Sequence, residues 1–236
     1  MQYTYKIIYD IDKDMWNWRR GVESSFFGES NIKNISNDDD LKIAQQIVGL
    51  DEKSSFSILK PYLESQKTDN DSKLNKFLQI AENDFRDKFT KACRALEYIT
   101  KRPMMSNSFI FYVTTFPRMP YFYEEREIFI YDSTDSFWGM PIDGFLHEGL
   151  HFQFIYYWQK DSLSPVSRLN EDKFDYLKEG LTVILDDELK PLISTPDNSY
   201  PSQLEFRKAL HANWKEHHDF DKLVDFGLKI LPDFVN

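Results

Sequence analysis

Two histidines in the stretch GFLHEGLHFQF, from Gly144 to Phe154, are four residues apart with a glutamate between them. The chain has only 5 histidines in 236 residues, so this pairing is unusual. Residues four apart lie on one face of an α-helix, about one turn from each other. His147 and His151 can therefore present nitrogens to a single ion, and Glu148, about 100° further round the helix, reaches a water bound to that ion. The H-E-x-x-H spacing predicts two zinc ligands and a general base.

Apolar side chains surround this polar triplet in the sequence. They are Phe145, Leu146, Leu150, Phe152, Phe154, Ile155, Tyr156, Tyr157 and Trp158. A helix that is apolar nearly all round is buried, and an unpaired polar group inside a protein costs several kcal/mol. Zinc coordination removes that cost. The alternative is two ordinary core histidines with hydrogen-bond partners, in which case the spacing is an accident.

A catalytic zinc keeps three protein ligands and leaves one position for water. The candidates downstream are His211, His217, His218 and several acids. In the stretch YLKEGLTVILDDEL, from Tyr176 to Leu189, Glu179 lies within a mostly apolar helical pattern, and Asp186 follows about two turns later. These two acids fit a ligand and a residue that supports it. The alternative for Glu179 is a solvent-facing helix acid beside Lys178.

The pair HEGLH and LKEGLT resembles the gluzincin metallopeptidases, in which H-E-x-x-H is followed by a helix that bears the third zinc ligand. In the aminopeptidase branch of that clan this helix often reads L-N-E-G-F-A. Leu177, Glu179, Gly180 and Leu181 match it in kind, whereas Lys178 and Thr182 depart from it. The resemblance covers about residues 128–187. A G-x-M-E-N signature for a substrate amine is missing from the sequence, so aminopeptidase specificity does not carry over.

The resemblance implies Zn²⁺ bound by His147, His151 and Glu179, and hydrolysis of a peptide or protein substrate with Glu148 as general base. It further implies a tyrosine or histidine from the C-terminal region that stabilises the oxyanion, for which Tyr200 and His211 are candidates. Asp186 is a candidate for orienting a ligand imidazole. In this family an edge strand beside the zinc helix pairs with the substrate backbone. The strand expected here comprises Glu127, Ile128, Phe129, Ile130 and Tyr131.

Two other classes of function remain open. One is a zinc protein that is not a peptidase, either a hydrolase of another amide or an inactive zincin-like scaffold. The other is a binding module in which HEGLH is accidental. Peptidase activity, as opposed to another hydrolysis, rests on the resemblance alone.

The remaining patterns predict an α+β fold that is mostly helical, with a small mixed or antiparallel sheet, and the gluzincin resemblance implies a zincin-like catalytic core. Apolar residues spaced three and four apart predict a helix over 74–99. Residues 108–116 and 126–133 are rich in β-branched and aromatic residues and predict two strands, which we expect to be antiparallel. A further strand is expected at the N-terminus, and helices over 175–189, 201–218 and 221–230. We expect a helical region over 1–103 and a catalytic region over 104–236, within one compact whole.

The amino-acid composition and net charge limit the classes of binding partner and the location of the protein. A net charge of −10 and a pI of about 5.0 disfavour nucleic acid and anionic membrane surfaces, because phosphate binding needs clustered Lys and Arg. The single cysteine, Cys93, excludes an internal disulfide. No signal peptide or membrane span is recognisable, since acids interrupt the N-terminal apolar residues and no apolar run approaches about 18 residues. We therefore expect a cytoplasmic protein; the oligomeric state stays open.

Overall fold

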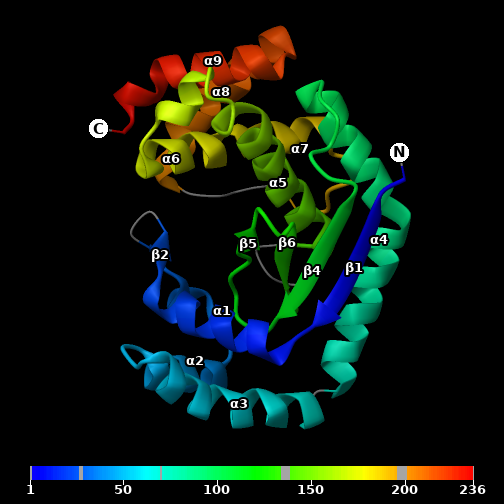
Figure 1. The fold of residues 1–236 in the computed structure, drawn as a ribbon, viewed down its shortest axis with the longest axis vertical. Coiled ribbons are helices and arrows are strands. Elements are labelled where there is room, and N and C mark those ends of the chain that lie inside the picture. Colours follow the sequence, from blue (N-terminus) through cyan, green and yellow to red (C-terminus); the bar gives the residue numbers. More distant parts are fainter. Residues whose placement is uncertain (1, 27–28, 70, 134–138, 196–200, 236) are drawn as a thin grey trace. The chain divides into compact units, whose positions relative to one another are not determined.

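The computed structural model describes residues 2–26, 29–69, 71–133, 139–195 and 201–235. This part of the chain is mostly helical and contains a four-stranded mixed sheet, which confirms the α+β class (Figure 1). The chain forms two compact units. The sheet unit comprises residues 4–86 and 108–141, and the helical unit comprises residues 1–3, 87–107 and 142–236.

Neither unit is a continuous range such as 1–103 or 104–236. The reason lies in the sheet, where strand β1 (Thr4–Tyr9) pairs along its whole length with β4 (Ser108–Thr114). Strands about a hundred residues apart in the sequence therefore belong to one hydrogen-bonded layer. The long helix α4 (Asp71–Thr100) contributes its first half to the sheet unit and its second half to the helical unit.

The strand order of the sheet is β1-β4-β6-β5, with β5 at Tyr121–Phe122 and β6 at Glu127–Tyr131. Strands β1, β4 and β6 are parallel to one another, and only β5 runs antiparallel, to β6. The predicted antiparallel pairing of the two central strands is therefore wrong. The hairpin lies between β5 and β6 instead, where Arg126 adopts a left-handed φ of 59° in the turn. This extra reversal brings β6 back parallel to β4.

The sheet unit also contains helices α1 (Ile11–Glu23), α2 (Asp38–Ile47) and α3 (Glu52–Asp69), and a small ribbon of β2 (Ser25–Phe26) and β3 (Glu29–Ser30). Asp10 and Asn37 cap α1 and α2 by accepting hydrogen bonds from backbone N–H groups of the first turns. The three helices enclose an apolar cluster of Met15, Trp18, Val22, Ala44, Ile47, Leu59, Leu63 and Phe116.

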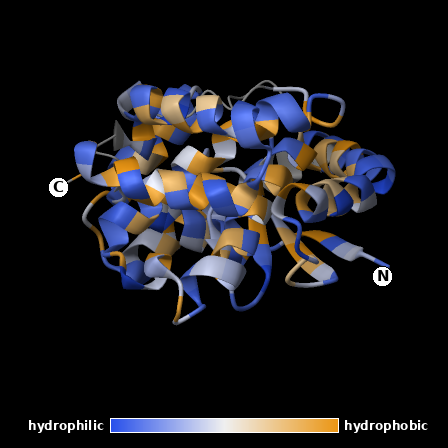
Figure 2. Cartoon of the chain, turned by 90° about the horizontal axis from the view of Figure 1, so that it is seen from above, coloured by the Kyte–Doolittle hydropathy of each residue, from blue (hydrophilic) through white to orange (hydrophobic). Residues whose placement is uncertain are grey.

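The helical unit contains the second half of α4 together with α5 (Pro141–Phe154), α6 (Glu171–Leu181), α7 (Leu185–Glu188), α8 (Leu204–His217) and α9 (Phe220–Ile230). These elements confirm the helices expected from the sequence. Hydrophobic and hydrophilic residues alternate in bands along most helices, as amphipathic packing requires (Figure 2). Aromatic rings fill the interior: Phe154 stacks on Phe174, and Trp158 meets Phe220 edge-on.

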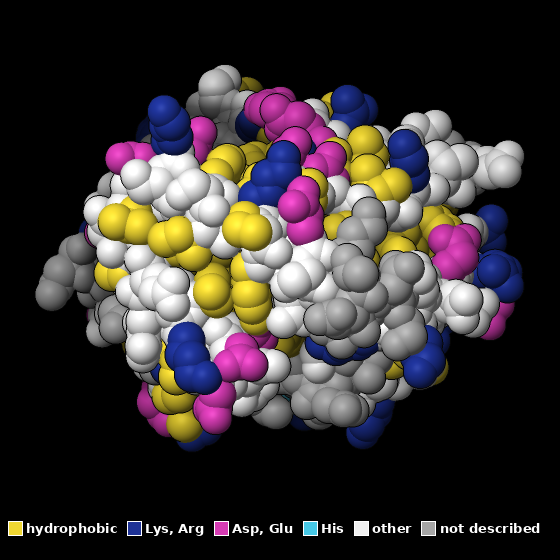
Figure 3. Space-filling model, turned by 90° about the horizontal axis from the view of Figure 1, so that it is seen from below, with side chains coloured by type: hydrophobic (Ala, Val, Ile, Leu, Met, Phe, Trp, Pro, Cys, Tyr) yellow, Lys and Arg dark blue, Asp and Glu magenta, His cyan; other side chains and the backbone are white. Residues whose placement is uncertain are grey.

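The surface is mixed in charge. The face drawn in Figure 3 carries acidic, basic and apolar side chains interspersed with one another. Among the described residues, none of the helices combines the length and the apolar composition needed to cross a bilayer.

Replacement of Leu59 by alanine tests the core of the sheet unit. Leu59 is 0% exposed within the apolar cluster, so Leu59→Ala should lower the free energy of unfolding by about 2–5 kcal/mol. The matched control is Leu163→Ala, because Leu163 is 85% exposed and its loss should change stability by less than about 0.5 kcal/mol. Urea titration followed by circular dichroism measures both. Equal effects of the two substitutions would contradict this packing.

Candidate metal centre

Helix α5 carries the H-E-x-x-H residues through the core of the helical unit. Pro141 occupies its first position, where a missing N–H is harmless. Asp143 in the first turn accepts hydrogen bonds from Ser194 through both N and Oγ (3.1 and 2.6 Å). The apolar residues Ile142, Phe145, Leu146, Leu150, Phe152 and Phe154 are all buried. The predicted burial of this helix is confirmed, so its polar triplet has little access to water.

Both motif helices depend on a glycine for close packing. A methyl group at Gly149 would lie 2.7 Å from Leu96 Cδ1 of α4, and one at Gly180 would lie 2.4 Å from Phe206 Cε1 of α8. Real carbon atoms do not approach so closely. Each glycine directly follows a buried glutamate in the sequence, Glu148 in α5 and Glu179 in α6. These two helices are therefore held against their neighbours at the positions where the polar residues lie.

Glu179 of α6 lies next to the two histidines of α5, and its role as a zinc ligand stays a prediction. Its Oε2 lies 3.1 Å from His147 Nε2 and 3.6 Å from His151 Nε2, and the two imidazole ring centres are 4.4 Å apart. Two ligands of one tetrahedral zinc, each about 2.0–2.1 Å from the ion, are separated by about 3.3 Å. The two distances bracket that value, and the longer one is outside hydrogen-bonding range. Glu179 Oε2 thus lies near one nitrogen of each imidazole, at hydrogen-bonding distance from His147, whereas the described residues whose ligand atoms all lie within 4.8 Å of one another are His147, Glu148 and His151.

The ionisable groups of this cluster are buried, and burial disfavours their charged forms. Glu179 is 4% exposed and His151 is 1% exposed, so the reading of Glu179 as a solvent-facing acid is wrong. Burial lowers the pKa of His151 below its ordinary value, against the opposing charges of Glu179 and Glu148. Burial thus favours the neutral imidazole, which is the form that binds a metal, whereas the neighbouring carboxylates favour the charged form. His147 keeps 15% of its side chain exposed, so solvent has access to the cluster at this residue.

Lys178 places a positive charge beside Glu179, and the sequence did not indicate this contact. Its side chain is buried, and its ammonium nitrogen lies 3.3 Å from Glu179 Oε1 and 3.1 Å from Asp175 Oδ1. Burial alone would raise the pKa of Glu179, but the neighbouring His151, Lys178 and His147 outweigh it and hold that pKa well below its usual range. Glu179 is thus ionised, with Oε1 facing the ammonium and Oε2 facing the histidines.

Glu148 contacts the second ring nitrogen of His151 and does not face solvent. Its Oε2 lies 3.0 Å from His151 Nδ1, the ring nitrogen that does not face Glu179. The side chain is buried, and His147, Glu148 and His151 offer ligand atoms within 4.8 Å of one another. Metal-binding histidines commonly donate their second N–H to a carboxylate. Glu148 therefore orients His151 through Oε2, and its other carboxylate oxygen is the one that can accept a proton.

The backbone that carries Glu179 is supported from α8. Arg207 is buried and donates through Nη1 to the carbonyl oxygen of Glu179 (2.9 Å) and to Thr182 Oγ1 (2.8 Å). Thr182 in turn donates to the same carbonyl oxygen (2.7 Å). The sequence gave little sign of Arg207, because a single arginine in an amphipathic helix is usually exposed. Thr182, which departs from the family pattern, anchors the end of α6.

The other predicted residues of this site have different surroundings. His211 on α8 pairs with Asp187 of α7 (2.5 Å), and Asp186 is half-buried on α7. Tyr200 falls outside the described residues. The oxyanion-stabilising roles of His211 and Tyr200, and the supporting role of Asp186, stay predictions. His217 and His218, the other histidines considered as ligands, are both exposed at the end of α8, where His218 pairs with Glu188 (3.2 Å).

The expected substrate strand, β6, belongs to the sheet unit, and its first three residues are not at an edge. Strand β5 pairs with Glu127 and Ile128, and Phe129 donates its N–H to Pro120 O. The Glu127 carboxylate is itself bound by Lys13 (2.6 Å). The interpretation of β6 as an edge strand is therefore wrong for Glu127, Ile128 and Phe129, because the β5–β6 hairpin occupies that side. Substrate binding by Ile130 and Tyr131 stays a prediction.

Comparison with known proteins adds no relative. No family model, curated protein or solved structure matches the chain. The gluzincin resemblance therefore rests on the residues that carry it.

Removal of the Glu179 carboxylate tests its place among the ligands. Glu179→Ala should lower zinc affinity by more than about 100-fold, which exceeds the usual effect of a residue that only supports a ligand. Glu171→Ala is the matched control, because Glu171 is exposed at the start of the same helix. Competition with a chromophoric chelator measures both affinities. An unchanged affinity in Glu179→Ala would assign the third ligand elsewhere, with His211 and His217 the next candidates.

Substitution of Lys178 separates a metal site from a purely structural ion pair. Lys178→Met should destabilise the zinc-free protein, since Glu179 then lacks its cation. Zinc should raise the melting temperature more in this variant than in the wild type, because the ammonium and the ion repel each other beside one carboxylate. Lys208→Met is the control, as Lys208 is exposed and pairs with Glu205 on α8. The same zinc-induced shift in all three proteins would contradict this arrangement.

Proposed function

We propose that this chain is a zinc-dependent hydrolase, and specifically a metallopeptidase with a zincin-like core. The observation that supports the proposal most strongly is the convergence of His147 Nε2, His151 Nε2 and Glu179 Oε2 at separations of 3.1 and 3.6 Å, within a buried region. Three protein ligands of this type leave a fourth zinc position for water, which is the pattern of a catalytic site. Peptide specificity comes from the resemblance to gluzincins.

A zinc ion held by these residues supplies a Lewis acid that polarises the scissile carbonyl and lowers the pKa of water toward neutrality. Glu148 then removes the proton from the attacking water as the new C–O bond forms. It later delivers that proton to the nitrogen of the leaving amine as the C–N bond breaks. His151 keeps its orientation through its Nδ1 contact with Glu148, and Lys178 keeps one oxygen of Glu179 occupied.

The charges of the cluster favour a bound cation over an accidental motif. Two buried carboxylates, Glu148 and Glu179, face the two histidines, and the one ammonium at Glu179, that of Lys178, also faces Asp175. Burial of carboxylates without matching positive charge is costly. A divalent cation would supply positive charge to these carboxylates, and His147 keeps 15% of its side chain exposed to solvent. The expected cytoplasmic location stays a prediction.

Glu148→Gln tests the hydrolytic mechanism. Glutamine keeps an oxygen for His151 Nδ1 but cannot take up a proton, so the variant should bind zinc like the wild type and lose hydrolysis by at least about 100-fold. The assay is cleavage of a mixed library of internally quenched fluorescent peptides, with zinc content measured on the same samples. Glu171→Gln is the control, with no change expected.

Two results would contradict the proposal in different ways. Activity that survives in Glu148→Gln would show that Glu148 only orients His151. Wild-type protein purified without chelator that contains far less than one zinc per chain, and that does not take up added zinc, would exclude the metal site altogether.

A further inference from the structure

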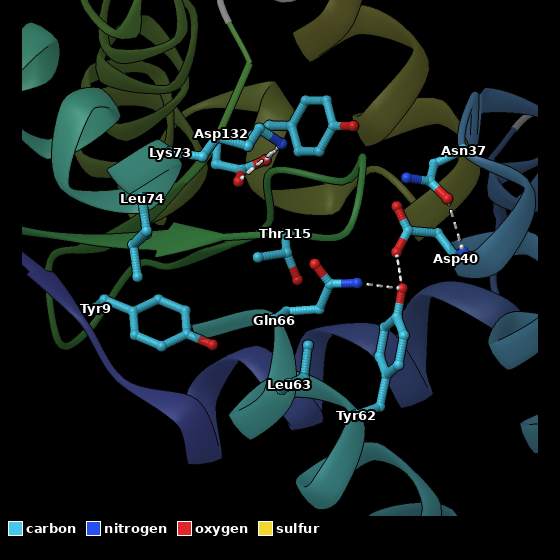
Figure 4. Close-up of a pocket in the computed structure, with 11 residues that line it drawn as sticks. Tyr9, Asn37, Asp40, Tyr62, Leu63, Gln66, Lys73, Leu74, Thr115 and Asp132 are labelled. Carbon is cyan, nitrogen blue, oxygen red and sulfur yellow. Dashed lines mark hydrogen bonds and ion pairs between the residues drawn. The ribbon is translucent and has the colours of Figure 1, made fainter. Parts of the chain in front are cut away.

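A pocket of about 300 Å³ lies in the sheet unit, at the carboxyl ends of its three parallel strands (Figure 4). Tyr9 is the last residue of β1, Thr115 follows β4, and Tyr131 and Asp132 stand at the end of β6; all four line the pocket. In open sheets, ligands bind outside the carboxyl ends of parallel strands, because the loops that follow the strands gather polar groups there. The position of this pocket therefore points to ligand binding.

Helices α2, α3 and α4 supply the other polar groups of this pocket. The Tyr62 hydroxyl donates to Asp40 and accepts from Gln66 Nε2 (3.1 Å), which forms a hydrogen-bonded chain along one side (Figure 4). Opposite, the Lys73 ammonium lies 3.3 Å from Asp132 Oδ2. Asp132 is buried, whereas the Lys73 side chain is largely exposed. The pocket thus combines two carboxylates, those of Asp40 and Asp132, with one partly exposed cation, that of Lys73.

Negative charge is in excess around this pocket. Burial raises the pKa of Asp132 to about 7, with Lys73 lowering it and Asp14 and Asp40 raising it further. Burial also raises the pKa of Asp40, despite the hydrogen bond from Tyr62. Asp14, which accepts a hydrogen bond from the Tyr9 hydroxyl (3.2 Å), is fully buried with a pKa raised to about 6. The two carboxylates that line the pocket, Asp40 and Asp132, therefore share the charge of a single lysine, Lys73, and a bound cation would stabilise them.

We propose that this pocket binds a small organic amine, with Asp40 and Asp132 as the charged acceptors and the tyrosines of the lining around its hydrocarbon body. The volume is at the lower end of the range for small-molecule sites, so it suits an amine of a few carbon atoms. Tyrosine rings provide apolar surface that also attracts cations. Lys73 is the one basic residue that lines the pocket in the described part of the chain, which disfavours an anionic ligand. The inference does not depend on zinc or on hydrolysis.

Titration calorimetry with 1,4-diaminobutane tests this proposal on the full chain at pH 8, where Asp132 is ionised. The diamine should bind, and the uncharged isostere 1,4-butanediol should give no measurable heat. Asp132→Asn and Asp40→Asn should each lower the affinity for the diamine by about tenfold or more, as expected for the loss of a charged hydrogen-bond partner. Asp39→Asn is the matched control, since Asp39 precedes Asp40 on α2 but is exposed and pairs with Lys42. The affinity of this variant for the diamine should stay close to that of the wild type.

Several results would overturn the proposal. They are absence of diamine binding, equal binding of the diol, and an affinity that neither Asp132→Asn nor Asp40→Asn changes. Heat from succinate that Lys73→Met removes would show an anion site instead, and heat from Ca²⁺ alone that Asp132→Asn removes would show a divalent-ion site. Circular dichroism verifies that each variant is folded; if one aspartate variant does not fold, the other carries the comparison.

Discussion

The helical unit depends on the burial of one ionised carboxylate, that of Glu179, between two imidazoles and an ammonium. Such a group is stable inside a protein only when positive charge and hydrogen bonds surround it. The chain meets this requirement with the Lys178 ammonium near Oε1 and His147 Nε2 at hydrogen-bonding distance from Oε2. Arg207 fixes the backbone from α8. The glycines after Glu148 and Glu179 let both helices approach their neighbours closely enough to keep the cluster buried.

Local sequence pattern was sufficient for most of the helices and strands and for the burial of the helix that carries His147 and His151. The apolar period of α4 and the four-residue spacing of His147 and His151 depend on helix geometry alone, so they are visible in a single sequence. Glu179 could be found because an acid in an apolar helix must have a partner. The class of fold followed from the order of helices and strands.

Features that depend on distant residues could not be predicted in this way. The direction of β6 is set by the β5–β6 hairpin, and a two-residue strand such as β5 carries almost no pattern. Lysine is usually exposed, so the sequence did not indicate that Lys178 is buried. Its ammonium pairs with Asp175 and Glu179 in the folded helical unit. The pocket at the strand ends combines residues from six segments, none of which has a recognisable motif by itself. A site of this kind can be recognised only in the structure, because the fold brings its residues together from separate parts of the sequence.

The most direct test of the metal centre is a crystal structure of protein purified without chelator, with data collected on both sides of the zinc absorption edge. An anomalous peak that appears only above the edge, within about 2.0–2.2 Å of His147 Nε2, His151 Nε2 and Glu179 Oε2, is the expected result. An ordered cluster without such a peak after zinc soaking, with Glu179 hydrogen-bonded directly to His147, would show that these residues form a structural network and would contradict the assignment.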